Sequence, residues 1–242
     1  MTPHVVPIVS REERMAHMPS GERDASLVSV GIVGGTGPQG RGLATRFAAA
    51  GNRVLIGSRD PERAQKAAAE LSEATGAEVV GADNTAVAQA ADVVVIAVPW
   101  AGHAATVASL VSELHGKIVV DCVNPLGFDD RGAYPVHVAE GSAAEQAAAL
   151  LPDSMVVGAF HHLSAVLLAD TSVERLEGDV LVVGDDRAST NLVCELAGRM
   201  AGLRGIYAGA LRNCHQVEAL TANLIAVNRR YRAHAGIRLT DV

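Results

Sequence analysis

The feature that most constrains the fold is a glycine cluster that directly follows a short apolar run. Residues 28–33 read Val-Ser-Val-Gly-Ile-Val, and glycines then stand at positions 34, 35, 37 and 40. The last three fit a G-x-G-x-x-G spacing, and positions 34, 37 and 40 also fit a looser G-x-x-G-x-x-G. Glycines placed in this way let a chain turn tightly from strand to helix and bring backbone N–H groups against a phosphate. The residues expected to line this phosphate-binding turn are Gly35, Thr36, Gly37, Pro38, Gln39 and Gly40.

Beyond residue 27, short apolar runs alternate with alanine-rich stretches. Aromatic residues make up only 3% of the chain, so the core must be packed from Val, Ala, Leu and Ile, which suits parallel strands covered by helices. We expect strands at 28–33, 53–56, 78–80, 92–98, 117–122, 155–159 and 180–183, and helices near 40–50, 61–75, 85–90, 103–114 and 143–151. This order predicts an α/β protein with a Rossmann-type, doubly wound and mainly parallel sheet.

Changes in pattern along the chain suggest three parts. Residues 1–26 are mixed and charged, and we interpret them as an N-terminal leader or arm. Residues 27–184 are the predicted Rossmann domain. Residues 185–242, with a helix near 189–201, a strand at 204–207 and a long helix from about 211 to 235, lack a further βαβ pattern. We therefore expect a small, mainly helical C-terminal subdomain.

The charge balance restricts the class of partner. A formal net charge of −7 argues against nucleic acid and against an anionic membrane surface, since both require a basic face.

The three cysteines, Cys122, Cys194 and Cys214, have no metal-ligand or redox spacing and suggest buried thiols in a reducing compartment. No apolar run is long enough to cross a bilayer, and the first residues lack the pattern of a signal peptide. A cytoplasmic location is expected.

The end of the second predicted strand indicates which dinucleotide is bound. NAD-binding folds usually place an acid there for the ribose 2′-hydroxyl. This chain has Ser58-Arg59, with Arg63 one helical turn later, and these residues can hydrogen-bond a 2′-phosphate. Asp60 is better explained as a helix cap. The alternative is that both arginines are solvated surface cations; we favour NADP(H).

Three further segments follow strands whose carboxyl ends share one edge of the predicted sheet, where ligands bind in such folds. They are Val98-Pro99-Trp100, Val123-Asn124-Pro125, and the run from Gly158 to Ala165 that contains His161-His162-Leu163. Trp100, the single tryptophan, is explained equally well by packing and by contact with a bound ring.

These motifs, together with Val33-Gly34-Gly35-Thr36-Gly37, Gly184-Asp185-Asp186 and Glu218-Ala219-Leu220-Thr221, resemble the NADPH-dependent reductases of coenzyme F420. The resemblance extends from about residue 28 to residue 239. It implies direct hydride transfer between NADP(H) and a 5-deazaflavin, either F420 or its precursor Fo, in a homodimer to which the C-terminal helices contribute.

The resemblance also implies roles for individual residues. Thr36, Ser58, Arg59 and Arg63 would hold the adenosine and phosphate end of NADP, and Val98, Pro99 and Trp100 would line the cofactor site. His161 and Leu163 would lie beside the nicotinamide, and Asn124, His162 and Thr221 would approach the deazaflavin. No residue is assigned as a certain acid or base, because hydride transfer depends mainly on the orientation of two rings.

Simpler explanations compete for several of these residues. Thr221 lies in a run with Leu220 and Leu224 that first of all predicts a buried helix face. Asp185-Asp186 is better read as a turn and helix cap than as a catalytic pair. His161 and His162 follow the strand expected at 155–159, and neighbours in an extended chain point to opposite faces, so we expect no metal site.

Two other functions stay open at this stage. One is an NADPH-dependent dehydrogenase or imine reductase of small molecules, although these enzymes commonly need a placed proton donor, and neither Lys66 nor Lys117 suits that role. The other is a non-catalytic NADPH-binding regulator, or the soluble module of a ferric-reductase electron chain.

Overall fold

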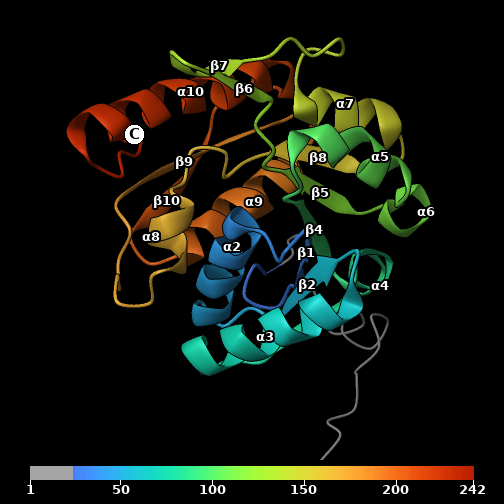
Figure 1. The fold of residues 1–242 in the computed structure, drawn as a ribbon. Helices are drawn as coiled ribbons and strands as arrows, with labels where there is room; N and C mark the ends of the chain where they lie inside the picture. Colours follow the sequence, from blue (N-terminus) through green and yellow to red (C-terminus); the bar gives the residue numbers. More distant parts are fainter. Residues whose placement is uncertain (1–23) are drawn as a thin grey trace, which may run out of the picture.

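The computed structural model describes residues 24–242, so the predicted leader lies, up to residue 23, outside the described residues. An eight-stranded sheet forms the centre, in the order β10-β9-β8-β5-β4-β1-β2-β3 (Figure 1). Its strands are β1 (Val30–Val33), β2 (Val54–Ser58), β3 (Val79–Asp83), β4 (Val93–Ile96), β5 (Ile118–Asp121), β8 (Met155–Gly158), β9 (Gly178–Gly184) and β10 (Leu203–Tyr207). Only β8 and β9 pair antiparallel; every other neighbouring pair in this sheet is parallel.

Helices cover both faces of the sheet. They are α2 (Pro38–Ala49), α3 (Pro61–Thr75), α4 (Asn84–Ala90), α5 (His103–Ala108), α6 (Val111–Leu114), α7 (Ala143–Leu150), α8 (Ala165–Ala169), α9 (Arg187–Arg199) and α10 (Cys214–Tyr231), with short 3-10 turns at Trp100–Gly102 and Leu211–Asn213. Two core clusters correspond to the two faces. The cluster on one face contains side chains from α2, α3, α8 and α9, and the other contains side chains from α4 to α7 and from α10. The Rossmann-type prediction is confirmed.

Strand residues alternate between the two clusters because successive side chains of a strand point to opposite faces. In β4, Val93 and Val95 belong to one cluster while Val94 and Ile96 belong to the other. All four are at most 1% exposed. Such two-sided burial requires the continuous apolar runs from which these strands were predicted.

The reading of residues 185–242 as lacking a βαβ pattern was wrong in one respect. β9, α9 and β10 form a βαβ unit, and β10 pairs parallel with β9 at the end of the main sheet. The antiparallel step between β8 and β9 concealed this unit, because it interrupts the regular alternation expected from the sequence. Within residues 185–242, β10 is the last strand of the sheet, and the chain from Leu211 onwards lies outside it, so the division at residue 184 stays a proposal.

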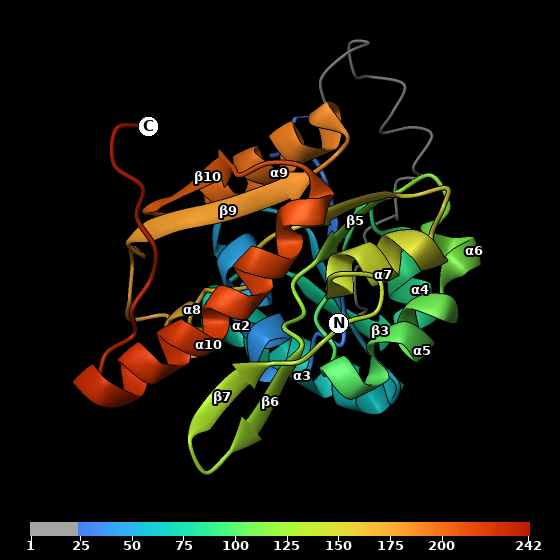
Figure 2. The same cartoon turned by 90° about the horizontal axis from the view of Figure 1, so that it is seen from above.

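The strands β6 and β7 and the short helix α8 were not predicted. β6 (Leu126–Asp129) and β7 (Gly132–Pro135) form an antiparallel hairpin where no strand or helix was expected. The hairpin and α10 lie together at one end of the molecule (Figures 1 and 2), and β7 contacts α10. The short helix α8 is held by the buried Arg46 of α2, whose guanidinium donates to the Leu168 and Asp170 carbonyls. Within residues 24–242, no helix has the length and apolar character needed to span a membrane.

Candidate functional site

The glycine cluster forms a tight turn between β1 and α2. Gly34 has φ of +75°, and a side chain there would meet Val98 Cγ1 at 2.7 Å. A side chain at Gly40 would meet the Cα atom of Gly35 at 2.6 Å. These glycines are therefore required by the close approach of the turn to α2 and to the segment after β4.

Gly37 differs from its neighbours because a side chain there would make only an ordinary contact and no close one. The nearest atom to a methyl group at Gly37 would be the Gly34 carbonyl oxygen, at 3.5 Å. Gly37 is also the N-cap of α2, no side chain of residues 24–242 caps the helix, and Pro38 follows at the first position. Among these residues the first-turn N–H groups of α2 consequently have no side-chain partner, which suits an anion such as a pyrophosphate.

The candidate 2′-phosphate site lies at the end of β2. Ser58 is buried, and its hydroxyl accepts a hydrogen bond from the Asp60 N–H at 3.2 Å. Asp60 caps α3 by accepting from the backbone of Glu62 and Arg63, which confirms its predicted role. The Arg59 and Arg63 side chains are exposed, and neither makes a hydrogen bond or ion pair with any described residue. Two uncommitted guanidinium groups beside a serine match the chemistry of a phosphate.

Asn84 was missed by the sequence analysis. It begins α4 directly after β3, and its Oδ1 accepts a hydrogen bond from the Gly34 N–H at 3.2 Å. A side chain at Gly57 would approach the same oxygen to 2.6 Å, so Gly57 leaves room for Asn84 to reach the glycine turn. The sequence could have indicated Asn84, because it is a polar residue at the carboxyl end of a strand that neighbours β2.

The turn after β8 is docked on the start of α2. Phe160 adopts φ of +66°, an uncommon conformation for a bulky residue. Its ring packs edge-on against Phe47 at 5.7 Å, and its carbonyl accepts from Gln39 Nε2 at 3.1 Å. The backbone reversal brings the His161 carbonyl beside the loop after β5.

At that point three elements meet. Asn124 Nδ2 donates to the His161 carbonyl at 2.9 Å. The Thr221 hydroxyl lies 3.2 Å from Asn124 Oδ1 and 3.4 Å from the same carbonyl. Thr221 is half-buried, so it belongs to a partly covered helix face and remains accessible from solvent. The structure thus joins the predicted residues Asn124 and Thr221 at the carboxyl edge of the sheet.

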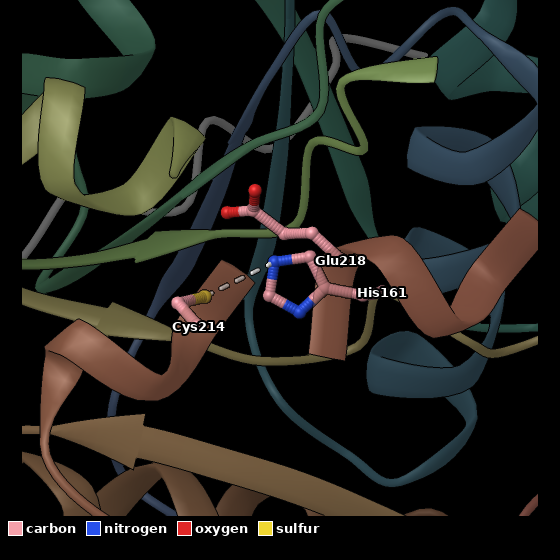
Figure 3. Close-up of side chains that lie close together, drawn as sticks. All are labelled: His161, Cys214 and Glu218. Carbon is pink, nitrogen blue, oxygen red and sulfur yellow. Dashed lines mark hydrogen bonds between the residues drawn. The ribbon is translucent and has the colours of Figure 1, made fainter. Parts of the chain in front are cut away.

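The His161 side chain points into the interior, toward the start of α10. It is 2% exposed, and its Nε2 lies 3.8 Å from Cys214 Sγ. Figure 3 shows the ring beside Cys214, with the Glu218 carboxylate above both. Burial lowers the pKa of His161 to about 4, with the nearby His162 acting in the same direction and Asp121 opposing it. The imidazole is therefore neutral near pH 7.

Glu218 fixes α10 against α7. Its two carboxylate oxygens accept from the N–H groups of Ala143 and Ala144, at 3.0 and 3.2 Å, in the first turn of α7. Burial raises the pKa of Glu218 to about 7, and Asp121 adds to the shift, while the two N–H donors oppose it. His161, Cys214 and Glu218 present ligand atoms within 4.8 Å of one another, a cluster that sequence spacing did not suggest. Both carboxylate oxygens are already engaged with the backbone, and burial raises the pKa of the Cys214 thiol well above its usual range.

A buried ion pair, His103 with Asp121, lies next to Trp100. His103 Nε2 lies 2.6 Å from Asp121 Oδ2, its Nδ1 lies 2.9 Å from Gln146 Oε1, and both members of the ion pair have fully buried side chains. Burial by itself lowers the pKa of His103, but its hydrogen bond and charge interaction with Asp121 outweigh burial, and the net shift is upward. Trp100 lies 5.6 Å from the His103 ring and packs against the core, so it has at least a packing role.

His162 and Leu163 lie toward the other face. His162 Nε2 donates to the Asp179 carbonyl at 2.7 Å. His162 and Leu163 line a narrow cavity together with His234 of the C-terminal segment. The two histidines stand in a turn after β8, not on the strand, yet their side chains do diverge as predicted. The ligand roles predicted for His161, His162 and Leu163 stay predictions. Asp186 caps α9 through Ser189, which confirms the structural reading of Asp185-Asp186.

Comparisons with known proteins agree with one another. The family model described as "NADP oxidoreductase coenzyme F420-dependent" matches residues 29–125. An F420-dependent NADP reductase of Methanothermobacter thermautotrophicus is 40% identical over 224 residues, covering 89% of this chain and 96% of the relative. That of Methanothermobacter marburgensis is 37% identical and covers 89% and 99%. A crystal structure from Arthrobacter, described as a candidate F420-dependent NADP reductase, has a TM-score of 0.72 at 25% identity and covers 88% of this chain and 99% of its own. The chain belongs to the family of F420-dependent NADP reductases.

Proposed function

We propose that this protein transfers a hydride between NADP(H) and coenzyme F420 at the carboxyl edge of its sheet. The observation that carries the proposal is the contact of Thr221 with Asn124, which holds a helix from outside the sheet over the end of β5. In a doubly wound fold the dinucleotide crosses this edge, so a second ring held by α10 would meet the nicotinamide there.

The dinucleotide end of the site is assigned as follows. The glycine turn and the first turn of α2 bind the pyrophosphate, and Thr36 lies in that turn. Ser58, Arg59 and Arg63 bind the 2′-phosphate, which selects NADP over NAD. Asn84 stabilises the glycine turn by accepting a hydrogen bond from the Gly34 N–H.

The other end of the site is assigned to the two rings. Val98, Pro99 and Trp100 extend from β4 toward the place where the nicotinamide would lie, and Asn124 and Thr221 border the space for the deazaflavin. When bound, the two cofactors supply the chemistry themselves, by passing a hydride between nicotinamide C4 and deazaflavin C5. The residues of this chain position the rings and exclude water.

His161 acts in this proposal through its backbone and through its neutral ring. Its carbonyl orients Asn124 and Thr221, while the buried imidazole fills the space between β8 and α10. The alternative of a dehydrogenase with a lysine proton donor gains no support from Lys117. Lys117 directly precedes the amino end of β5, whereas the candidate site lies at the carboxyl ends of the strands. Its ammonium donates to the carbonyls of Ala88, Gln89 and Ala91. The homodimer, the cytoplasmic location and the lack of a nucleic-acid partner stay predictions.

The experiment is a single-turnover reaction with NADPH that carries deuterium at C4 of the nicotinamide. Mass spectrometry of the reduced deazaflavin then reports the fate of the label. Transfer of deuterium from one of the two C4 positions to the deazaflavin supports direct hydride transfer. Reduction without any label from either C4 epimer, or no reduction at all, contradicts it.

A further inference from the structure

An open hollow of about 690 Å³ lies between the β6–β7 hairpin and the second half of α10. The hairpin contributes Phe128, Asp129, Arg131, Gly132 and Ala133, and α10 with its C-cap contributes Ile225, Ala226, Arg229, Arg230 and Arg232. Both elements lie at the same end of the molecule (Figure 2). The hollow is separate from the glycine turn, so it is not part of the NADP site.

Its lining is cationic in a protein that is acidic overall. Arg131, Arg229, Arg230 and Arg232 line it, whereas the formal net charge of the chain is −7. Among the described residues that line the hollow, Asp129 alone is acidic, and its carboxylate accepts from the N–H groups of Arg131 and Gly132 within the hairpin turn.

The four arginine side chains are exposed, and none of them makes a hydrogen bond or ion pair with another described residue. Surface arginines at a helix end are usually solvated, but here four of them converge on one hollow from two separate elements. Guanidinium groups that converge in this way favour phosphate and carboxylate ligands, to which they donate in pairs.

The hollow is connected to the candidate hydride-transfer site by one face of α10. Thr221, Ile225 and Arg229 are spaced four residues apart, so they follow one another along the same side of the helix. The eight residues from Thr221 to Arg229 rise by about 12 Å at about 1.5 Å per residue. A flexible chain that starts from a ring beside Thr221 therefore reaches the arginines by following α10.

We propose that this hollow binds the anionic tail of the deazaflavin substrate, a chain that carries one phosphodiester and several carboxylates. The proposal rests on the proposed function, because it takes the ring of the same substrate to lie at Thr221. Coenzyme F420 carries this tail and Fo lacks it, so the hollow selects F420 over Fo as the physiological acceptor. Arg229 and Arg230 on α10 and Arg131 on the hairpin are the binding residues.

The test compares F420 and Fo as acceptors for NADPH, with the wild-type protein and with the Arg229→Ala/Arg230→Ala variant. Loss of charge-assisted contacts is expected to raise the KM for F420 about tenfold or more and to leave kcat and the KM for Fo unchanged. Arg175→Ala, which removes an exposed arginine between α8 and β9, is the matched control and should change neither KM. A Lys pair at positions 229 and 230 should restore part of the affinity for F420.

Two further measurements separate tail binding from other effects. Added salt should raise the KM for F420 and not that for Fo, because the contacts are exposed ion pairs. Titration of the deazaflavin fluorescence gives binding constants without turnover, and γ-linked oligoglutamate should compete with F420 and not with Fo.

The outcomes distinguish this proposal from the one on which it rests. Equal KM values for F420 and Fo, unchanged in the double variant, would overturn the tail site while turnover of both acceptors leaves the hydride transfer intact. Failure of NADPH to reduce either acceptor would refute both proposals.

Discussion

The hydroxyl of Thr221 lies 3.2 Å from Oδ1 of Asn124, and this contact ties the last long helix to the loop that follows β5. The two residues are 97 positions apart in the chain, and each also bonds the carbonyl of His161. The candidate site is therefore held by three elements that meet at one backbone oxygen, and its geometry depends on how α10 is seated.

Removing the Thr221 hydroxyl tests that dependence. Thr221→Val keeps the shape of the side chain and loses the hydrogen bonds, so kcat/KM for the deazaflavin should fall about fivefold, the equivalent of about 1 kcal/mol. The KM for NADPH and the melting temperature should change little. Thr221→Ser retains the hydroxyl and should keep most of the activity. Equal activity of the Val and Ser variants would show that the hydroxyl has no part in positioning.

The 2′-phosphate assignment predicts a change in cofactor preference. Arg59→Asp removes a guanidinium and places a carboxylate at the end of β2, so the KM for NADPH should rise about tenfold or more while that for NADH rises little. Lys66→Ala removes another exposed cation from α3 and serves as the control. An unchanged ratio of NADPH to NADH activity in the Arg59 variant would be incompatible with the assignment.

The Rossmann part of the molecule was predictable because its signals are local. The glycine cluster marks the turn after β1, and Asp60-Pro61 marks the start of α3, whose predicted range 61–75 matches the structure. Buried strands such as β4 show the continuous apolar runs that burial on both faces requires.

What the sequence did not reveal depends on contacts between distant residues. Glu218 and the start of α7 are about 75 positions apart, and nothing near either residue announces their hydrogen bonds. The sequence around His103 did not indicate a buried ion pair, because its partner Asp121 is the last residue of a later strand, β5. The β6–β7 hairpin was not predicted because its residues alternate poorly between apolar and polar, and within residues 24–242 β6 and β7 pair only with each other.

The His103–Asp121 pair should be important for stability. His103→Leu leaves a fully buried carboxylate without its charge partner, so the free energy of unfolding should fall by about 3–5 kcal/mol. The exposed pair of His115 and Asp153, 3.5 Å apart, offers a matched control. His115→Leu should cost less than about 1 kcal/mol. Urea denaturation of both variants makes the comparison, and losses of similar size would contradict the importance of burial.

Glu218 should make the stability of the protein depend on pH. Its pKa of about 7 in the folded state lies above the ordinary value of 4.5, so its contribution is fully present below pH 4.5 and is lost as the pH rises through about 7. Glu218→Gln cannot ionise and should lack this loss. Across that window the wild type should lose about 3 kcal/mol relative to the variant. Denaturation curves at several pH values measure the difference, and parallel profiles would show that the carboxyl titrates normally.

Hydride transfer is tested by mixing the purified protein with NADPH and F420 and following the visible absorbance of the oxidised deazaflavin. A hydride-transfer site that is selective for NADP predicts rapid bleaching with NADPH and much slower bleaching with NADH. Persistent absorbance under conditions in which NADPH binding is detected would contradict it, because the dinucleotide site would then be present without the hydride acceptor.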